Sequence, residues 1–249
     1  MVLSYELNII RPISVPMTNP TSIVWHLLRI KSFILILGCS LSCTDSNVER
    51  AVSTTSSIDS AEKPFTILIL GDSLTEGYGI DEDLAYPTLL EKKLNQESNK
   101  GAKRIYRIIN GGISGSTTSG GVSRIDWFLR TKPDFLILAL GGNDGLRGIP
   151  VEKIKSNLIK VVNAAQNNRI PVLIAGMKIP PNYGLPYSEA FSKIFPQIAK
   201  EYNIPLLPFL LEGVGGNPKM NLPDRIHPNP EGHSVIAETV HNRLIVELS

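Results

Sequence analysis

From residue 65 onward, short runs of apolar residues alternate with longer stretches in which apolar residues recur at helical spacing. These short runs are continuously apolar except for Thr66 and Arg107, which is typical of strands buried on both faces of a parallel sheet. This alternation predicts a three-layer, doubly wound α/β sandwich around a central five-stranded parallel sheet. The expected strands span residues 65–70, 105–109, 135–140, 172–175 and 205–207, and the expected helices span residues 84–97, 118–130, 151–168, 187–202 and 230–247.

Composition supports one folded domain of this kind. The chain has 249 residues, of which 42% are hydrophobic and 19% are charged, enough for a sizeable buried core and unlike a disordered chain. The formal net charge is +2, and residues 1–38 carry this whole excess, because residues 39–249 hold equal numbers of basic and acidic side chains. A body without net charge gives no reason to expect a nucleic-acid partner.

The residues just before position 39 have the pattern of an export signal. Arg29 and Lys31 precede a short apolar run at 33–37, and Gly38 follows it. Basic residues, an apolar stretch and a small residue are the parts of a secretory signal. The run is too short to cross a bilayer, since a spanning helix needs about 20 apolar residues. We therefore expect residues 1–38 to be a leader and the protein to be exported, with a hydrophobic N-terminal arm as the alternative.

Both cysteines of the chain, Cys39 and Cys43, follow this run directly, so the body has no thiol nucleophile, disulfide or cysteine metal site. The sequence Ile-Leu-Gly-Cys that ends at Cys39 resembles the lipobox of bacterial lipoproteins, in which the cysteine is lipidated. This resemblance implies a membrane-anchored lipoprotein modified at Cys39, or less favourably at Cys43. A plain signal peptide is the alternative. Residues 39–62 are rich in Ser and Thr and are expected to form a flexible tether before a folded domain at 63–249.

The loops that leave the carboxyl ends of parallel strands gather at one edge of the sheet, where functional residues are expected. The first such loop is Gly71-Asp72-Ser73-Leu74. Ser73 follows a buried strand and opens a helical turn, where backbone amides favour negative charge, which suits a nucleophile whose attack creates an oxyanion. The alternative is structural, with Asp72 or Ser73 serving only as a helix cap.

The next two loops offer hydrogen-bond donors. Residues 110–116 are rich in glycine, so their backbone can approach a ligand and direct N–H groups toward it. Residues 141–148 contain Asn143, whose side-chain amide can donate to an oxyanion. Each loop also has a purely structural interpretation, as a flexible turn or as ordinary Asn-Asp-Gly turn chemistry.

The fourth loop contains His227, which lies three residues after Asp224. This spacing lets the carboxylate reach the Nδ1–H of the imidazole and leaves Nε2 free to accept a proton. His233 and His241 fall in the last amphipathic stretch, where packing or surface roles are expected, and His26 lies in the leader. No metal site is expected, because no His-x-x-x-His pair or comparable set of ligands occurs.

Together these loops supply a nucleophile, a base, a residue to orient the base, and oxyanion donors. The sequence resembles the SGNH (GDSL) hydrolase family. Within this family it is similar to the subgroup of multifunctional thioesterase I / protease I / lysophospholipase L1 enzymes and related arylesterases. The four blocks of the family appear in order as Gly71-Asp72-Ser73-Leu74, Gly115, Gly142-Asn143-Asp144 and Asp224-x-x-His227. The resemblance implies a flavodoxin-like fold without a cofactor. It also implies Ser73 as nucleophile, His227 as base and Asp224 as its orienting partner, with an oxyanion hole made by Ser73, Gly115 and Asn143.

The expected function is that of a serine esterase acting on small acyl esters or thioesters through an acyl-enzyme. Aryl esters, acyl-CoA thioesters and lysophospholipids are the substrate classes that the resemblance implies. Two alternatives remain open, a carbohydrate O-acetylesterase and a non-catalytic surface lipoprotein that binds lipid. The protein is expected to be exported in a bacterium, either free in the periplasm or anchored to a membrane as a lipoprotein. One departure from the family is Ser116, which stands where close relatives often carry Asp.

Overall fold

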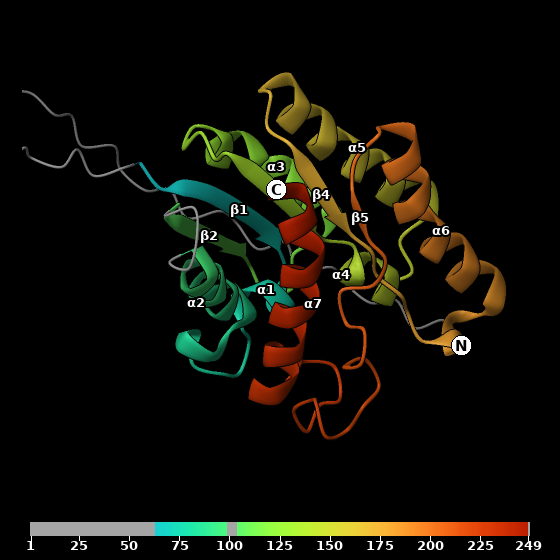
Figure 1. The fold of residues 1–249 in the computed structure, drawn as a ribbon. Helices are drawn as coiled ribbons and strands as arrows, with labels where there is room; N and C mark the ends of the chain where they lie inside the picture. Colours follow the sequence, from blue (N-terminus) through green and yellow to red (C-terminus); the bar gives the residue numbers. More distant parts are fainter. Residues whose placement is uncertain (1–62, 99–103, 249) are drawn as a thin grey trace, which may run out of the picture. The chain divides into compact units, whose positions relative to one another are not determined.

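The computed structural model describes residues 63–98 and 104–248, drawn in colour in Figure 1. All of them fall within one compact unit. The predicted leader, the Ser/Thr-rich tether and Cys39 lie outside the described residues, so these interpretations stay predictions. Among the helices within the described ranges, none is both long and apolar enough to cross a membrane.

Five parallel strands form a single sheet in the order β2-β1-β3-β4-β5 (Figure 1). The two strands inside the sheet that carry the longest apolar runs, β1 and β3, are covered on both faces, and every side chain of β3 is buried. This confirms the central parallel sheet expected from the continuous apolar runs. The bounds are β1 Phe65–Gly71, β2 Tyr106–Gly112, β3 Phe135–Ala139, β4 Val172–Ala175 and β5 Leu206–Leu207.

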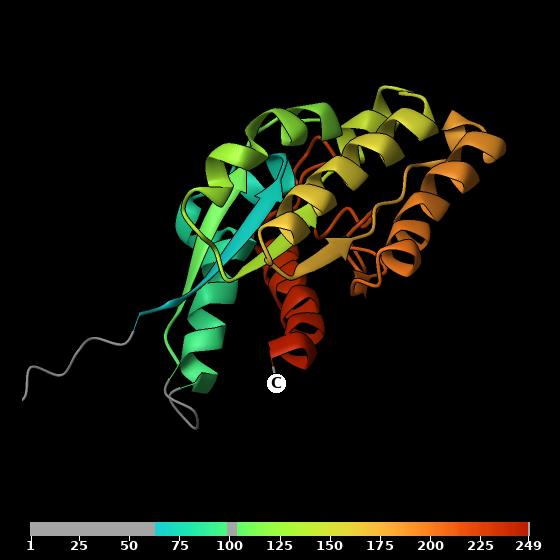
Figure 2. The same ribbon diagram turned by 90° about the horizontal axis from the view of Figure 1, so that it is seen from above.

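Helices cover both faces of the sheet and complete the three layers. Figure 2 shows α3, α5 and α6 on one side, while α2 and α7 pack together on the other. In α5 the buried residues Ile154, Leu158, Val161, Val162 and Ala165 recur at helical spacing and form the apolar stripe that faces the sheet. The bounds are α2 Tyr86–Ser98, α3 Thr118–Leu129, α5 Val151–Asn167, α6 Leu185–Glu201 and α7 Pro230–Leu248.

Two aspects of the sequence-based prediction need correction. Strand β2 continues to Gly112, so Asn110-Gly111-Gly112, expected in a loop, belong to the sheet and pair in register with the end of β1. The strand can run this far because Gly112 has no side chain, since a Cβ there would lie 2.1 Å from the backbone nitrogen of Glu76. Three short elements were not expected: η1 Glu82–Leu84, α4 Gly142–Leu146 and η2 Pro181–Tyr183. The helical turn expected at Ser73 forms as α1 Ser73–Glu76.

The strand order explains where a site can form. The chain passes from β1 outward to β2 and then returns across β1 to β3. The crossovers therefore diverge between β1 and β3, and a crevice is expected at the carboxyl ends of these two strands. The segments that follow β1, β2 and β3 meet at this edge of the sheet, and they include three of the four predicted loops.

Candidate active site

Ser73 is the first residue of α1, which begins two residues after the end of β1. Asp72 caps this helix, and its Oδ1 accepts a hydrogen bond from the backbone N–H of Leu74 at 3.0 Å. The turn packs tightly on the strand, because a Cβ at Gly71 would lie 1.9 Å from Thr75 Oγ1. The structural interpretation of Asp72 is thus correct, and the cap it forms also fixes the backbone of Ser73.

His227 lies in the loop between β5 and α7, and its side chain reaches back across 154 residues to Ser73. His227 Nε2 and Ser73 Oγ are 3.0 Å apart, and His227 Nδ1 and Asp224 Oδ2 are 2.7 Å apart. Asp224 Oδ1 also accepts the backbone N–H groups of Ile226 and His227, at 2.9 and 3.0 Å. The loop is closed by a hydrogen bond from the Leu222 N–H to the His227 carbonyl, at 2.7 Å.

The charge state of Asp224 decides which nitrogen of His227 carries the hydrogen. The backbone N–H of His227, more than any other partner, lowers the pKa of Asp224 to about 2. Asp224 is therefore a carboxylate that only accepts hydrogen bonds, so a neutral His227 carries its hydrogen on Nδ1. Nε2 then faces Ser73 Oγ as an acceptor, which is the orientation a general base requires.

Asn143 lies in α4, and its side chain points toward the residues that adjoin Ser73 and Gly115. Its Nδ2 donates to the Ser116 carbonyl at 3.1 Å and, at a longer 3.4 Å, to Asp72 Oδ2. Gly115 has a φ of +73°, and its carbonyl accepts a hydrogen bond from Arg147 Nη2 at 3.1 Å. The four predicted blocks are therefore brought together at the carboxyl edge of the sheet.

Burial shifts the titration of one further carboxyl beside Ser73. Asp72 is 2% exposed, and this burial raises the pKa of Asp72 to about 6, although the Leu74 N–H and other partners act in the opposite direction. A carboxyl that stays protonated into weakly acidic solution thus lies next to the candidate nucleophile.

Comparison with known proteins identifies the family of this chain. A model of the GDSL-like Lipase/Acylhydrolase family matches residues 69–235, which include every residue of the predicted site. The chain belongs to this family. The resemblance inferred from four short blocks is thereby confirmed, and the protein is a GDSL/SGNH-type hydrolase.

Individual relatives cover most of the described domain. An arylesterase of Vibrio mimicus is 38% identical over 183 residues, which are 73% of this chain and 89% of the relative. The thioesterase 1/protease 1/lysophospholipase L1 of Escherichia coli K12 is 36% identical over 180 residues, 72% of this chain and 83% of the relative. Among solved structures, the psychrotrophic esterase EstA from Pseudoalteromonas sp., inhibited by monoethylphosphonate, has a TM-score of 0.69 at 34% identity, covering 74% of this chain and 98% of that one.

Several side chains around the site of this GDSL-like hydrolase were not expected from sequence. The Tyr78 ring lies 4.4 Å from the His227 ring, measured between centroids and tilted by 39°, and restrains the imidazole from one side. Glu76 Oε2 accepts the backbone N–H of Ser114 at 2.7 Å and holds the loop that carries Gly115. The one signal in the sequence for these contacts is that Glu76 and Tyr78 lie three and five residues after Ser73.

The other two described histidines are structural. His233 is buried, and its Nδ1 accepts the backbone N–H of Tyr86 at 3.1 Å, which links α7 to the start of α2. His241 is also buried and lies 2.9 Å from Glu97 through its Nε2. Both agree with the packing role expected for this amphipathic stretch. Within residues 63–98 and 104–248, no group of three or more His, Cys, Asp or Glu side chains could hold a metal ion.

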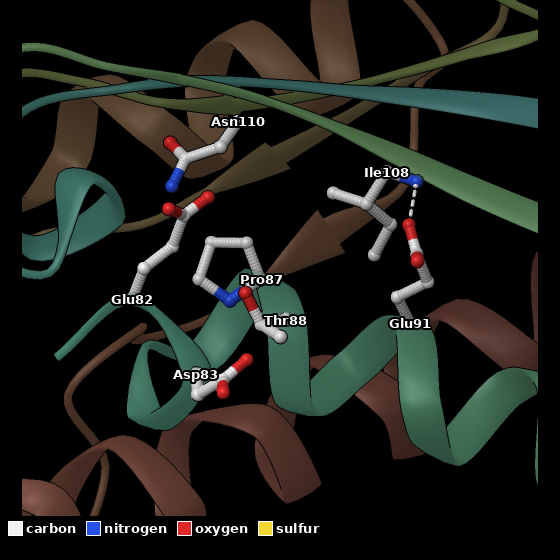
Figure 3. Close-up of a pocket in the computed structure, with 7 residues that line it drawn as sticks. All are labelled: Glu82, Asp83, Pro87, Thr88, Glu91, Ile108 and Asn110. Atoms are coloured by element: carbon white, nitrogen blue, oxygen red, sulfur yellow. Dashed lines mark hydrogen bonds between the residues drawn. The ribbon is translucent and has the colours of Figure 1, made fainter.

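Two hollows lie on the β2 side of the hydrolase, and the second borders the candidate site, because Glu76 and Tyr78 line it. Figure 3 shows one of them, with a volume of about 400 Å³, where Glu91 Oε2 accepts the backbone N–H of Ile108 at 2.5 Å. The other has a volume of about 510 Å³ and shares Glu82 and Asn110 with the first. Neither is lined by Ser73 or His227, so the hydrogen-bond geometry, and not the size of a hollow, locates the site.

Proposed function

We propose that this hydrolase is a serine esterase in which Ser73 is the nucleophile, His227 is the general base and Asp224 orients His227. The observation that carries the proposal is the continuous line of contacts from Asp224 through both nitrogens of His227 to Ser73 Oγ, at 2.7 and 3.0 Å. These distances are those required for a nucleophile, its base and the group that orients the base.

In the acylation step, Ser73 Oγ attacks the carbonyl carbon of the substrate while His227 Nε2 takes the hydroxyl proton. The carbonyl electron pair moves to oxygen and a tetrahedral oxyanion forms. When this intermediate collapses, the bond to the leaving oxygen or sulfur breaks, and His227 gives its proton to the alkoxide or thiolate. Water then attacks the Ser73 acyl ester with His227 again as base, which releases the acid and restores Ser73.

Three donors are assigned to the oxyanion: the backbone N–H groups of Ser73 and Gly115 and the side-chain amide of Asn143. The two contacts of Asn143 Nδ2 differ in length, and the contact to Asp72 is the longer one, at 3.4 Å. The hydrogen on that side is held less firmly, and we assign it to the oxyanion. One side-chain donor of this kind typically contributes about 10²- to 10³-fold to the rate.

Carboxylic esters and thioesters are the proposed substrates. The names of the relatives, an arylesterase and a thioesterase 1/protease 1/lysophospholipase L1, support acyl compounds with aryl, thiol or lysolipid leaving groups. Ser73 is 7% exposed, which favours a substrate whose acyl carbonyl can reach a recessed hydroxyl.

Hydrolysis of p-nitrophenyl butyrate by the wild type and by Ser73→Ala tests the reaction. We expect Ser73→Ala to lose nearly all turnover and to lose labelling by a fluorophosphonate probe. Full activity of the variant would overturn the proposal, and a wild type that the probe does not label would favour a non-catalytic lipid-binding protein. A series of esters of increasing chain length then separates a lipid-directed esterase from a carbohydrate O-acetylesterase, which would prefer acetate.

We also propose that the protein is exported from a bacterial cell and tied to a membrane through a lipid on Cys39. The basic residues, the apolar run and the lipobox-like sequence before Cys39 support this, and the Ser/Thr-rich segment 39–62 supports a tether. Metabolic labelling with a palmitate analogue in wild type, Cys39→Ser and Cys43→Ser tests it. Label that persists in Cys39→Ser and disappears in Cys43→Ser would move the anchor to Cys43, and an unlabelled wild type would leave a plain signal peptide.

A further inference from the structure

The guanidinium of Arg124, in α3, binds three acceptors from three different segments. Arg124 Nη1 donates to the Gly111 carbonyl at 2.5 Å, and Nη2 donates to the Gly71 carbonyl at 2.6 Å and to Ser116 Oγ at 3.1 Å. Gly71 and Gly111 lie at the carboxyl ends of β1 and β2. The guanidinium therefore ties two strand ends to the loop that follows the second of them.

These three acceptors lie next to the groups to which we assign the oxyanion. Gly71 precedes Ser73 by two residues, and Ser116 follows Gly115 directly. The carbonyl of the same Ser116 accepts the side-chain amide of Asn143 at 3.1 Å. Each proposed donor thus lies within two residues of a residue that Arg124 binds, or is joined to such a residue by one hydrogen bond.

We propose that Arg124 is a positioning residue, which holds the three oxyanion donors in register so that they point at one oxygen atom. The inference rests on the proposed function, because it presupposes those donors. They come from the segments after β1, β2 and β3, so no single element fixes their mutual distances. An oxyanion hole is effective only when its donors are placed before the reaction, which requires a rigid link between such segments.

The chemistry of the side chain suits this task. A guanidinium is planar and presents several N–H donors in a fixed fork, whereas an ammonium is a single point on a flexible stem. Arg124 Nε is buried without a hydrogen-bond partner in the part of the chain that the structure describes. The fold therefore accepts one unsatisfied donor here, and the two terminal nitrogens keep the geometry that reaches all three acceptors.

Steady-state hydrolysis of p-nitrophenyl butyrate by the full-length protein tests the inference in Arg124→Leu, Arg124→Lys, Ser116→Ala and the double variant Arg124→Leu/Ser116→Ala. Arg130→Leu is the matched control, because Arg130 is an exposed arginine that ends the same helix. Thermal melting confirms that each variant is folded.

We expect kcat of Arg124→Leu to fall about tenfold or more while KM changes less than about threefold, because only the transition state uses the oxyanion donors. Arg124→Lys should recover part of the loss, since an ammonium can bind the strand carbonyls without reaching every acceptor. Ser116→Ala should lower kcat by a smaller factor, and this factor should shrink toward one in the Arg124→Leu background, because the contact it removes is already gone.

A folded Arg124→Leu with kcat within about twofold of wild type would overturn the inference, as would a raised KM with unchanged kcat. An effect of Ser116→Ala that persists in full in the Arg124→Leu background would also overturn it. If Arg124→Leu does not fold, unchanged kcat in both Ser116→Ala and Arg124→Lys would overturn the inference instead. Failure of the proposed function is distinguished by Ser73→Ala, which would then retain activity.

Discussion

Replacing Asp72 by Asn should remove a pH dependence of stability that this buried carboxyl imposes on the fold. Burial raises the pKa of Asp72 from its ordinary value of 3.8 to about 6 in the folded protein. Asn is close in shape and keeps an oxygen that can accept the Leu74 N–H, so the cap of α1 survives. The new asparagine side chain would place an NH₂ group, in place of the accepting Oδ2, opposite the Nδ2 of Asn143. The loss of that contact costs the same free energy at every pH.

The sign and size of the effect follow from proton linkage. The folded-state pKa lies above the unfolded value, so between about pH 4 and about pH 6 the folded protein binds more protons than the unfolded chain. Stability therefore falls as the pH rises through this window, and the contribution is fully lost above the folded-state pKa. A shift of about two units corresponds to about 3 kcal/mol, since each unit is worth about 1.4 kcal/mol.

Urea unfolding at about pH 4 and about pH 7.5 measures this difference. The free energy of unfolding of Asp72→Asn relative to wild type should rise by about 3 kcal/mol from the lower to the higher pH. Asp126→Asn, which removes an exposed carboxyl from α3, is the control for a general change in charge. A difference between Asp72→Asn and wild type that stays constant across this range would refute the burial argument.

Three further substitutions have expected outcomes. Asn143→Ala should lower kcat for p-nitrophenyl butyrate about 10²- to 10³-fold with little change in KM, and a loss confined to KM would contradict its assignment. Asp224→Asn should lower kcat about 10⁴-fold without unfolding the protein, because an amide can hold His227 in the wrong tautomer; kinetics together with a melting curve checks this. Gly112→Ala should lower the free energy of unfolding by about 1–3 kcal/mol in urea, because the new Cβ would meet the Glu76 backbone at 2.1 Å, and an unchanged value would show that α1 can move away.

Sequence alone was sufficient for the elements whose patterns repeat. The apolar run of β3 and the stripe of α5 each contain several residues that point to the same environment, and both elements formed close to where they were expected. Helices α1 and α4 have four and five residues, too few to complete a periodic pattern. They depend instead on single local features, the cap formed by Asp72 and a φ of +119° at Gly141, which helical periodicity does not report.

The candidate site divides in the same way. Asp224 and His227 are three residues apart, so their contact could be expected from local geometry. The contact between His227 and Ser73 depends on the order of the strands, which brings two distant loops to one edge. Arg124 could not be predicted, because in sequence it is one charged residue of an amphipathic helix. Its partners are mainly backbone carbonyls at strand ends, and these have no signature in the sequence.

The two histidines near the start of α7 show that environment, and not residue type, decides which one can act as a base. His227 has a carboxylate on Nδ1 and the Ser73 hydroxyl on Nε2, so a proton taken from Ser73 leaves a cation that Asp224 stabilises directly. Six residues later, burial lowers the pKa of His233 to about 4, and the Tyr86 N–H occupies its Nδ1. Because Nδ1 accepts this hydrogen bond, the hydrogen of the neutral ring lies on Nε2, which is buried without a partner among the described residues. Neither nitrogen is therefore available to take a proton from a substrate. The uncharged ring of His233 instead joins α7 to α2. This contact fixes the start of α7, which directly follows the loop that carries His227.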